Sequence, residues 1–265
     1  SFRNLIINGD MAVAQRGASF AAVTNTAYML DRYTYVQGGT TGVITVTQDT
    51  DVPNEEFDFS LKVDVTTADA AVAAGDVAAI SQYVEAFNTS ALQLGTATAA
   101  TFTLSFWVKS PKTGAHYVTI QNNASDRSYP ALYTVSVADT WEKKTITITG
   151  DTTGTWVRGT NGIGIKVHFT LICGTNYHGT ADTWNAGTDW AASGVVNCFD
   201  NTANNFYITG VQLEVGSSAT DFEHVPWDYQ LSRCQRYYQK SFAYGTAPAQ
   251  NVGILTGEVN FTSNR

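Results

Sequence analysis

Strict alternation of apolar and polar residues is the feature of this sequence that most constrains its fold. Residues 163–171 carry Ile, Val, Phe or Leu at every second position, and residues 59–65 and 102–108 repeat the pattern. Alternation with a period of two places one face of a β-strand in a core and the other toward solvent. Shorter alternating segments lie at 43–47, 117–121, 132–137 and 144–149. With Gly, Asn, Asp and Pro turns between them, they predict about ten strands, which indicates a β-sandwich or barrel rather than βαβ units.

The composition agrees with an all-β fold and excludes several classes of partner. Only 14% of the residues are charged, against roughly 25% in an average globular protein, and Thr, Ser, Asn, Gln and Gly supply the polarity. Nucleic-acid binding depends mainly on positively charged side chains that contact phosphates, and the net charge of −8 offers no excess of them. No nucleic acid is therefore expected as a partner. The same sign disfavours an anionic membrane surface, and no apolar run reaches the roughly 18 residues of a membrane span. We therefore expect no membrane insertion.

Residues 206–238 predict a last strand followed by a short helix that ends a domain. The apolar phase of the strand inverts near Gly210, which predicts a β-bulge at that position. After Pro226, apolar side chains recur at the spacing of one helix face, namely at Trp227, Leu231, Cys234 and Tyr238. Asp228 is the expected N-cap of this helix.

The cysteines do not form a metal-binding pattern. Cys173, Cys198 and Cys234 are an odd number, so at least one is free unless it pairs between chains. Their spacing does not match a zinc site. We expect buried, reduced thiols that behave as small hydrophobes, with a Cys173–Cys198 disulfide as the alternative.

Motifs spread along most of the chain occur in an order typical of one protein family. They are RNLIINGDMAVAQRG (3–17), YMLDRYTY (28–35), ISQYVEAF (80–87), TLSFWVKSPKTGAHYVTIQN (103–122), ITGVQLEVGSSATDFEHVPW (208–227) and LSRCQRYYQKS (231–241). Together they resemble the carbohydrate-binding-module-like jelly roll of bacteriophage and prophage tail fibre proteins. The first motif departs from the family, because Ala14 stands where an aromatic residue usually precedes Gln-Arg-Gly.

The resemblance implies a specific fold and domain organisation. We expect an all-β chain in which residues 1–240 form a jelly-roll β-sandwich that ends in a short C-terminal exit helix. Residues 241–265 would form a connector and the first strands of a further β module.

The resemblance also implies a function. The chain would be a domain of a virion tail fibre, assembled in the bacterial host cytoplasm, that attaches the phage to a host-cell surface glycan. The glycan partner would be a polysaccharide or lipopolysaccharide, and a homotrimer in contact with other tail fibre proteins is expected. The first alternative is a purely structural trimeric module without a ligand, and the second is a glycan-degrading tail enzyme.

No metal or cofactor is expected. Related jelly rolls often hold a structural calcium ion between the first and last strands, where the last strand carries paired Asp residues. Here Thr209 and Gly210 stand in that place.

The sequence indicates no catalytic residues, so we do not expect an enzyme. Glycoside hydrolysis needs two facing carboxylates, and no spacing singles out such a pair. Asp31 is expected to pair with Arg32 or to cap a turn, whereas Glu85 and Glu214 are expected to be solvated or to make cross-strand contacts. The histidines show neither ligand spacing nor a nucleophile partner; they are His116, His168, His178 and His224.

The loop-rich segment 154–205 gathers side chains suited to sugar binding. Sugar rings stack their C–H faces on aromatic planes, and polar side chains hold the hydroxyls. The residues predicted to contact a glycan are Trp156, Arg158, Tyr177, Trp184, Asp189 and Trp190. We expect Trp156, Tyr177 or Trp190 to be the stacking platform. Packing of these tryptophans inside the sandwich is the alternative.

Overall fold

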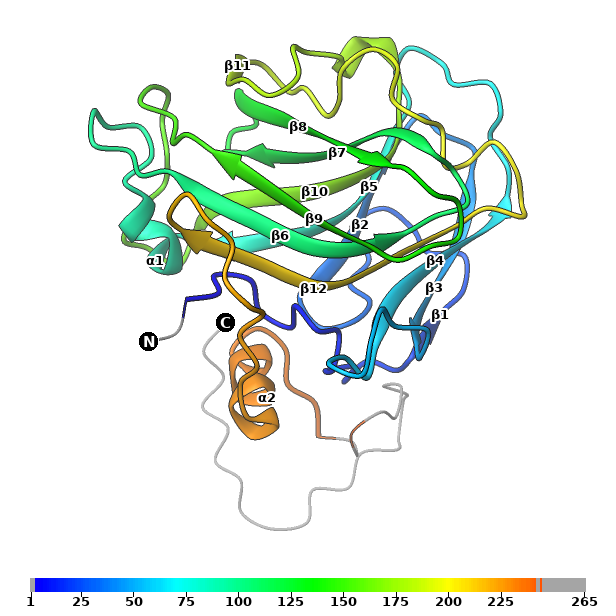
Figure 1. Ribbon diagram of the computed structural model, residues 1–265, viewed down its shortest axis with the longest axis horizontal. Coiled ribbons are helices and arrows are strands. Elements are labelled where there is room, and N and C mark those ends of the chain that lie inside the picture. Colours follow the sequence, from blue (N-terminus) through cyan, green and yellow to red (C-terminus); the bar gives the residue numbers. More distant parts are fainter. Residues whose placement is uncertain (1–2, 242–243, 245–265) are drawn as a thin grey trace.

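The computed structural model describes residues 3–241 and 244, which contain two six-stranded sheets packed face to face (Figure 1). The strands of the first sheet are, in spatial order, β1 (Ser19–Phe20), β3 (Val43–Asp49), β4 (Ser60–Thr67), β12 (Asn205–Val215), β6 (Phe102–Lys109) and β9 (Glu142–Ile148). Those of the second sheet are β11 (Asn185–Ala186), β8 (Arg127–Val135), β7 (Gly114–Gln121), β10 (Ile163–Cys173), β5 (Val77–Glu85) and β2 (Tyr33–Gly38).

The order of the strands makes this sandwich a jelly roll. All the strand pairs within these sheets are antiparallel. The chain passes from β4 in the first sheet to β5 in the second, returns to β6 and crosses again to β7. It crosses once more between β8 and β9, then to β10 and finally to β12. The predicted fold class is therefore confirmed, and the long alternating segments at 59–65, 102–108 and 163–171 lie in or at the edge of β4, β6 and β10.

The core lies between the sheets because the apolar face of each strand points inward. Phe106 of β6 and Phe169 of β10 meet edge to face across the sandwich, with ring centroids 5.1 Å apart. Both side chains are buried. Burying a phenylalanine contributes about 1.5–3 kcal/mol, so each such cross-sheet pair strongly favours the closed sandwich.

The predicted β-bulge is present at Gly210. The register of β12 against β6 shifts between Thr209 and Gln212, and Gly210 has a φ of +61°. The apolar phase inverts there, so that Ile208 before the bulge and Val211 after it both face the core. A Cβ atom at Gly210 would lie only 2.8 Å from the Phe57 ring, which also favours glycine.

The exit helix is present as α2 (Trp227–Gln235), and it lies outside the two sheets beside the N-terminal segment (Figure 1). Its Cys234 is buried in a small cluster with Ile7 and Val13. The prediction of Asp228 as the N-cap is wrong: Pro226 occupies that position, and Asp228 lies in the first turn. There its negative charge still favours the positive end of the helix dipole.

The other helical elements are short. Helix α1 (Ala86–Thr89) continues directly into a 3₁₀ turn at Ser90–Leu92, and a second 3₁₀ turn lies at Thr175–Tyr177. The further β module predicted for residues 241–265 lies outside the described residues, except for Ser241 and Tyr244, so the domain division stays a prediction.

All three cysteines are buried free thiols, as expected, and Cys173 and Cys198 do not form a disulfide. Burial raises the pKa of Cys173 and that of Cys198 to about 12, so both thiols remain protonated at neutral pH.

Candidate functional site

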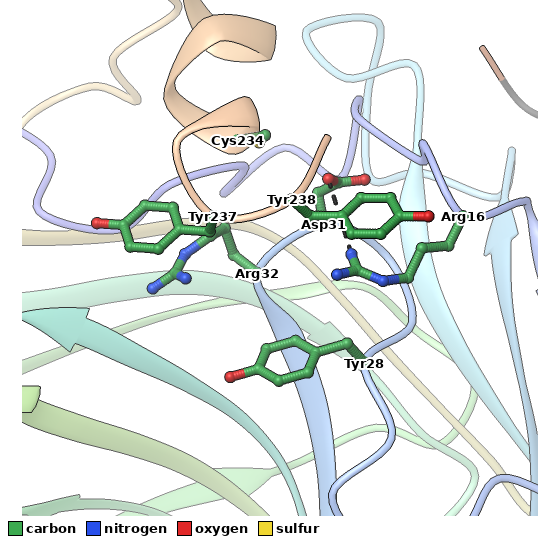
Figure 2. Close-up of a pocket in the computed structure, with 7 residues that line it drawn as sticks. All are labelled: Arg16, Tyr28, Asp31, Arg32, Cys234, Tyr237 and Tyr238. Carbon is green, nitrogen blue, oxygen red and sulfur yellow. Dashed lines mark ion pairs between the residues drawn. The ribbon is translucent and has the colours of Figure 1, made fainter. Parts of the chain in front are cut away.

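A cavity of about 180 Å³ opens between the end of the exit helix and the segment that leads into β2 (Figure 2). Its lining residues are Arg16, Tyr28, Asp31, Arg32, Cys234, Tyr237 and Tyr238. They come from the segments 3–17, 28–35 and 231–241, which are three of the motifs that carry the family resemblance. The fold thus brings together residues that are far apart in the sequence, and we call this cavity the exit-helix pocket.

Asp31 is a buried member of the exit-helix pocket, and its hydrogen bonds come from Gln15, which lies in the turn at 14–17. The backbone N–H of Gln15 donates to Asp31 Oδ2 at 2.7 Å, and the Gln15 side-chain amide donates to Oδ1 at 2.6 Å. Arg16 Nη1 lies 3.9 Å from Asp31 Oδ1 (Figure 2). The predicted pair with Arg32 is absent from these contacts. Burial raises the pKa of Asp31, although the bonds from Gln15 and the charge of Arg16 oppose the shift.

Arg32 contacts other groups than Asp31, and its backbone lies in the left-handed region, with a φ of +73°. Its guanidinium carbon lies 3.5 Å from the ring centroid of Tyr237, and Nη2 donates to the backbone oxygen of Tyr83. Nε is buried and has no hydrogen-bond partner among the described residues. Burial lowers the pKa of Arg32 from its usual value. The pocket therefore contains a desolvated cation that contacts an aromatic ring and a backbone oxygen and leaves one donor without a partner in the described part of the chain.

Arg16 lies between two aromatic rings. Its guanidinium carbon is 3.5 Å from the centroid of the Tyr238 ring and 5.5 Å from that of Tyr28. The Tyr28 side chain is 41% exposed, so solvent reaches this side of the pocket. Aromatic faces beside guanidinium groups offer both stacking surface and hydrogen-bond donors.

A second cavity, of about 220 Å³, lies beside the exit-helix pocket and shares Tyr237 with it. Its lining includes Glu85, whose carboxylate accepts two hydrogen bonds from Arg236, at 2.9 Å from Nε and 2.5 Å from Nη2. The Tyr237 hydroxyl also donates to Glu85. These bonds hold the pKa of the Glu85 carboxyl below its usual value and attach the end of α2 to β5.

The sequence predicts that Glu85 and Glu214 are solvated or make cross-strand contacts, but both side chains are buried, and their hydrogen bonds come from Arg236, Gln212 and Thr220 rather than from a neighbouring strand. Glu214 accepts bonds from the Thr220 N–H at 2.8 Å, from its hydroxyl at 2.9 Å, and from Gln212 Nε2 at 2.9 Å. Each carboxylate therefore fixes a segment that follows the sandwich, and Glu85 does so at the wall of the second cavity.

Trp156 and Trp190 are buried, with 9% and 7% of their surfaces exposed. The Trp156 ring meets the Trp184 ring edge to face at 5.4 Å, and its Nε1 donates to the Thr153 oxygen at 3.1 Å. The Trp190 ring lies 4.2 Å from the His168 ring. The burial of these two side chains agrees with the packing alternative and leaves little ring surface for a sugar.

The other predicted glycan contacts have more exposed surface. Trp184 is half-buried and donates from Nε1 to the Thr149 oxygen at 2.7 Å, whereas Tyr177 packs against the cluster that contains Trp190. Asp189 Oδ2 lies 3.4 Å from the hydroxyl of Ser128, and Arg158 is exposed.

The structure thus brings four of the six residues together, in two separate pairs. Trp156 contacts Trp184, and the Trp190 N–H donates to the Tyr177 oxygen at 2.8 Å. The role of these residues in glycan binding stays a prediction.

Two nucleophile–histidine pairs that sequence reasoning missed are present inside the sandwich. Ser81 Oγ lies 2.7 Å from His168 Nδ1, and Cys198 Sγ lies 4.0 Å from His116 Nδ1. All of these side chains are buried, and burial lowers the pKa of His168 to about 3. No substrate reaches these atoms in this conformation, so the pairs act as packing and hydrogen-bonding groups.

Metal ligands do not gather anywhere in the part of the chain that the structure describes: no group of three or more His, Cys, Asp or Glu side chains is placed to hold an ion. At Thr209, where the sequence lacks the paired Asp residues of a calcium site, the side-chain hydroxyl donates to the Phe59 oxygen at 2.7 Å. Within residues 3–241 and 244, no helix is long and apolar enough to cross a membrane.

No protein-family model and no curated protein matches the chain. Among solved structures, a putative sugar binding protein from Bacteroides thetaiotaomicron is 14% identical, with a TM-score of 0.44, over 81% of this chain and 100% of that one. A CBM4 structure is 14% identical, with a TM-score of 0.42, over 79% of this chain and 98% of that one.

The active domain of bacteriophage CBA120 tailspike protein 4 is 16% identical, with a TM-score of 0.38, over 74% of this chain. The matched region spans 21% of that tailspike and 26% of an α-L-arabinofuranosidase that also matches. At these identities and TM-scores the similarities carry no functional argument, and the jelly roll rests on its own strand order.

Proposed function

We propose that the chain is a domain of a bacteriophage or prophage tail fibre that attaches the virion to a host-cell surface glycan without cleaving it. The observation that carries the proposal is the convergence of the tail-fibre-like motifs on the exit helix. Gln15 bonds Asp31, Arg32 stacks on Tyr237, and other contacts join the segments 80–87 and 231–241. Four of the six motifs behind the sequence resemblance thus meet near the end of the exit helix.

Binding suits this surface better than catalysis. The exit-helix pocket offers the rings of Tyr28 and Tyr238 and the guanidinium of Arg16, groups that stack on sugars and donate to their oxygens. The carboxylates of Asp31 and Glu85, in contrast, are each occupied by hydrogen bonds. Hydrolysis would need two carboxylates facing a bound sugar.

A structural module without a ligand is the second candidate, and the attachment of the exit helix favours it. The Glu85–Arg236 pair and the cluster of Ile7, Val13 and Cys234 fix the direction in which α2 leaves the sandwich. A fixed exit direction is what a fibre needs to connect one module to the next. In both candidates we propose a homotrimer in the virion, assembled in the host cytoplasm and joined to other tail fibre proteins.

Binding of the 265-residue chain to an array of bacterial surface glycans tests the proposal. We expect saturable, reversible binding to at least one polysaccharide or lipopolysaccharide, with no release of reducing ends on prolonged incubation. A release of reducing ends would contradict the non-catalytic part of the proposal. Absence of binding to any glycan would favour the structural module.

A further inference from the structure

We propose that the exit-helix pocket binds a carboxylate-bearing sugar residue, such as a uronic acid unit of a bacterial surface polysaccharide. The geometry points to Arg16 as the group that binds the carboxylate and to Tyr28 as the ring against which the sugar lies. This inference rests on the proposed function as a glycan-binding domain, and it names the class of glycan and the site.

Charge is the first reason for an acidic ligand. The pocket lining contains the two guanidinium groups of Arg16 and Arg32 but the single carboxylate of Asp31. This local excess of positive charge occurs on a chain with a net charge of −8, which repels anions elsewhere. An anion is therefore favoured at this pocket specifically and not by the protein as a whole.

The hydrogen-bonding state of Arg16 is the second reason. Gln15 already supplies both hydrogen bonds to Asp31, whereas Arg16 Nη1 stands 3.9 Å away, beyond the roughly 2.7–3.2 Å of a hydrogen bond. Within the described part of the chain, the Arg16 guanidinium makes no hydrogen bond to the protein. Its planar donors match the two oxygens of a carboxylate.

Burial of Arg32 is the third reason. The residue is only 9% exposed, and although Nη2 donates to Tyr83 and the charge of Glu85 favours the cation, Nε lacks a partner among the described residues. A buried donor without an acceptor is costly, and an anionic oxygen in the adjoining cavity would lower that cost. A neutral sugar would add no negative charge beside the two guanidinium groups, which outnumber the one carboxylate of the pocket lining.

The walls and size of the pocket indicate a sugar rather than a simple ion. The Tyr28 ring is 41% exposed and lies beside Arg16, where a sugar ring could contact it while its carboxylate meets the guanidinium. The volume of about 180 Å³ is below the roughly 300–1,000 Å³ of pockets that enclose drug-sized ligands. The pocket therefore suits one sugar residue of a polymer that continues along the surface.

Calorimetric titration of the intact chain with glucuronate, glucose and inorganic phosphate tests the inference. We expect glucuronate to bind, with an affinity that falls as salt is raised, because salt screens exposed charges. Glucose and phosphate should each bind about tenfold or more weakly. Arg16→Gln and Tyr28→Ala should each reduce glucuronate affinity by about tenfold or more, the effect of one charge-assisted contact.

Arg3→Gln is the matched control, because Arg3 is exposed, lies outside the pocket lining and changes the net charge by the same amount. It should bind glucuronate as the wild type does, and all variants should melt at a similar temperature. Equal binding of glucose and glucuronate would overturn the acidic-sugar inference while leaving the proposed function intact. Phosphate binding as tight as that of glucuronate would overturn the assignment to a sugar.

If Arg16→Gln still bound glucuronate and Arg158→Gln did not, the assignment to the exit-helix pocket would be overturned. The glycan site would then lie in the segment 154–205. Failure of every glycan on the array would instead refute the proposed function. The two levels of the hypothesis therefore fail by different results.

Discussion

Replacement of Trp190 by alanine separates packing from ligand binding in the segment 154–205. Its side chain is 7% exposed and belongs to an apolar cluster with Val77, Tyr117 and Cys173. The ring also lies 4.2 Å from His168. Trp190 thus covers the outer face of the second sheet, and its removal should leave a cavity there.

The size of the effect follows from this burial. Truncation of a core tryptophan costs about 3–5 kcal/mol, which corresponds to a melting temperature lowered by about 6–20 °C for a domain of this length. The loss would come from the side chain alone, because alanine keeps the backbone oxygen. That oxygen accepts hydrogen bonds from Thr119 at 2.7 Å and from Thr170 at 2.8 Å.

Thermal and urea unfolding of Trp190→Ala and of the wild type would measure the change. Trp227→Ala is the matched control, since the Trp227 side chain is 50% exposed and meets the Tyr244 ring edge to face, so its loss should cost about 1 kcal/mol, well below the cost of Trp190→Ala. Trp190→Phe should retain most of the wild-type stability. An unchanged melting temperature for Trp190→Ala combined with lost glycan binding would refute the packing interpretation.

Three further predictions concern buried titratable groups. Glu85→Gln should lower the unfolding free energy by about 1–3 kcal/mol at pH 7. The pKa of Glu85 is lower in the folded chain than in the unfolded chain. The difference in unfolding free energy between wild type and Glu85→Gln should therefore be present above pH ~4.3 and disappear as the pH falls through the depressed pKa. Urea titrations at several pH values would measure it. Burial lowers the pKa of His168 to about 3, so below pH ~6.5 the unfolded chain binds a proton that the folded chain does not. Stability should therefore fall from pH 7 toward pH 4, and His168→Gln should reduce that slope. The three buried thiols should resist a water-soluble disulfide reagent in the folded chain and all react in concentrated guanidinium; labelling of the native protein would contradict their burial.

The strands and the bulge were predictable because they depend on local patterns. Alternation at 102–108 requires only that one face of a strand be apolar, and the phase inversion at Gly210 is visible in the sequence. The helix after Pro226 was predictable for the same reason. The N-cap residue of this helix was not predictable in the same way, because Pro226 itself occupies the N-cap position and Asp228 therefore lies in the first turn.

The contacts of the site depend on backbone conformation and long-range pairing, which the sequence does not display. Asp31 and Arg32 are adjacent, but Arg32 has a positive φ and the two side chains contact different partners. Ser81 meets His168 only because of the register between β5 and β10. Glu85 is buried because the exit helix, about 150 residues later, brings Arg236 to it.

The tryptophans of the segment 154–205 illustrate a different limit. Their composition suits both a sugar platform and a cover for a sheet, and only the path of the loop distinguishes the two. That path places Trp190 against β5 and β10 rather than in solvent.

Adsorption of the purified chain to a panel of bacterial cells, with and without periodate oxidation of their surface glycans, tests the central claim most directly. Periodate cleaves vicinal diols of sugars and leaves most surface proteins able to bind. The proposed function predicts adsorption to particular strains that is lost after periodate treatment. Because the chain is proposed to bind without cleaving, the surface polysaccharide of these strains should keep its length during incubation with the chain. Adsorption that survives periodate and disappears after protease treatment of the cells would contradict a glycan receptor.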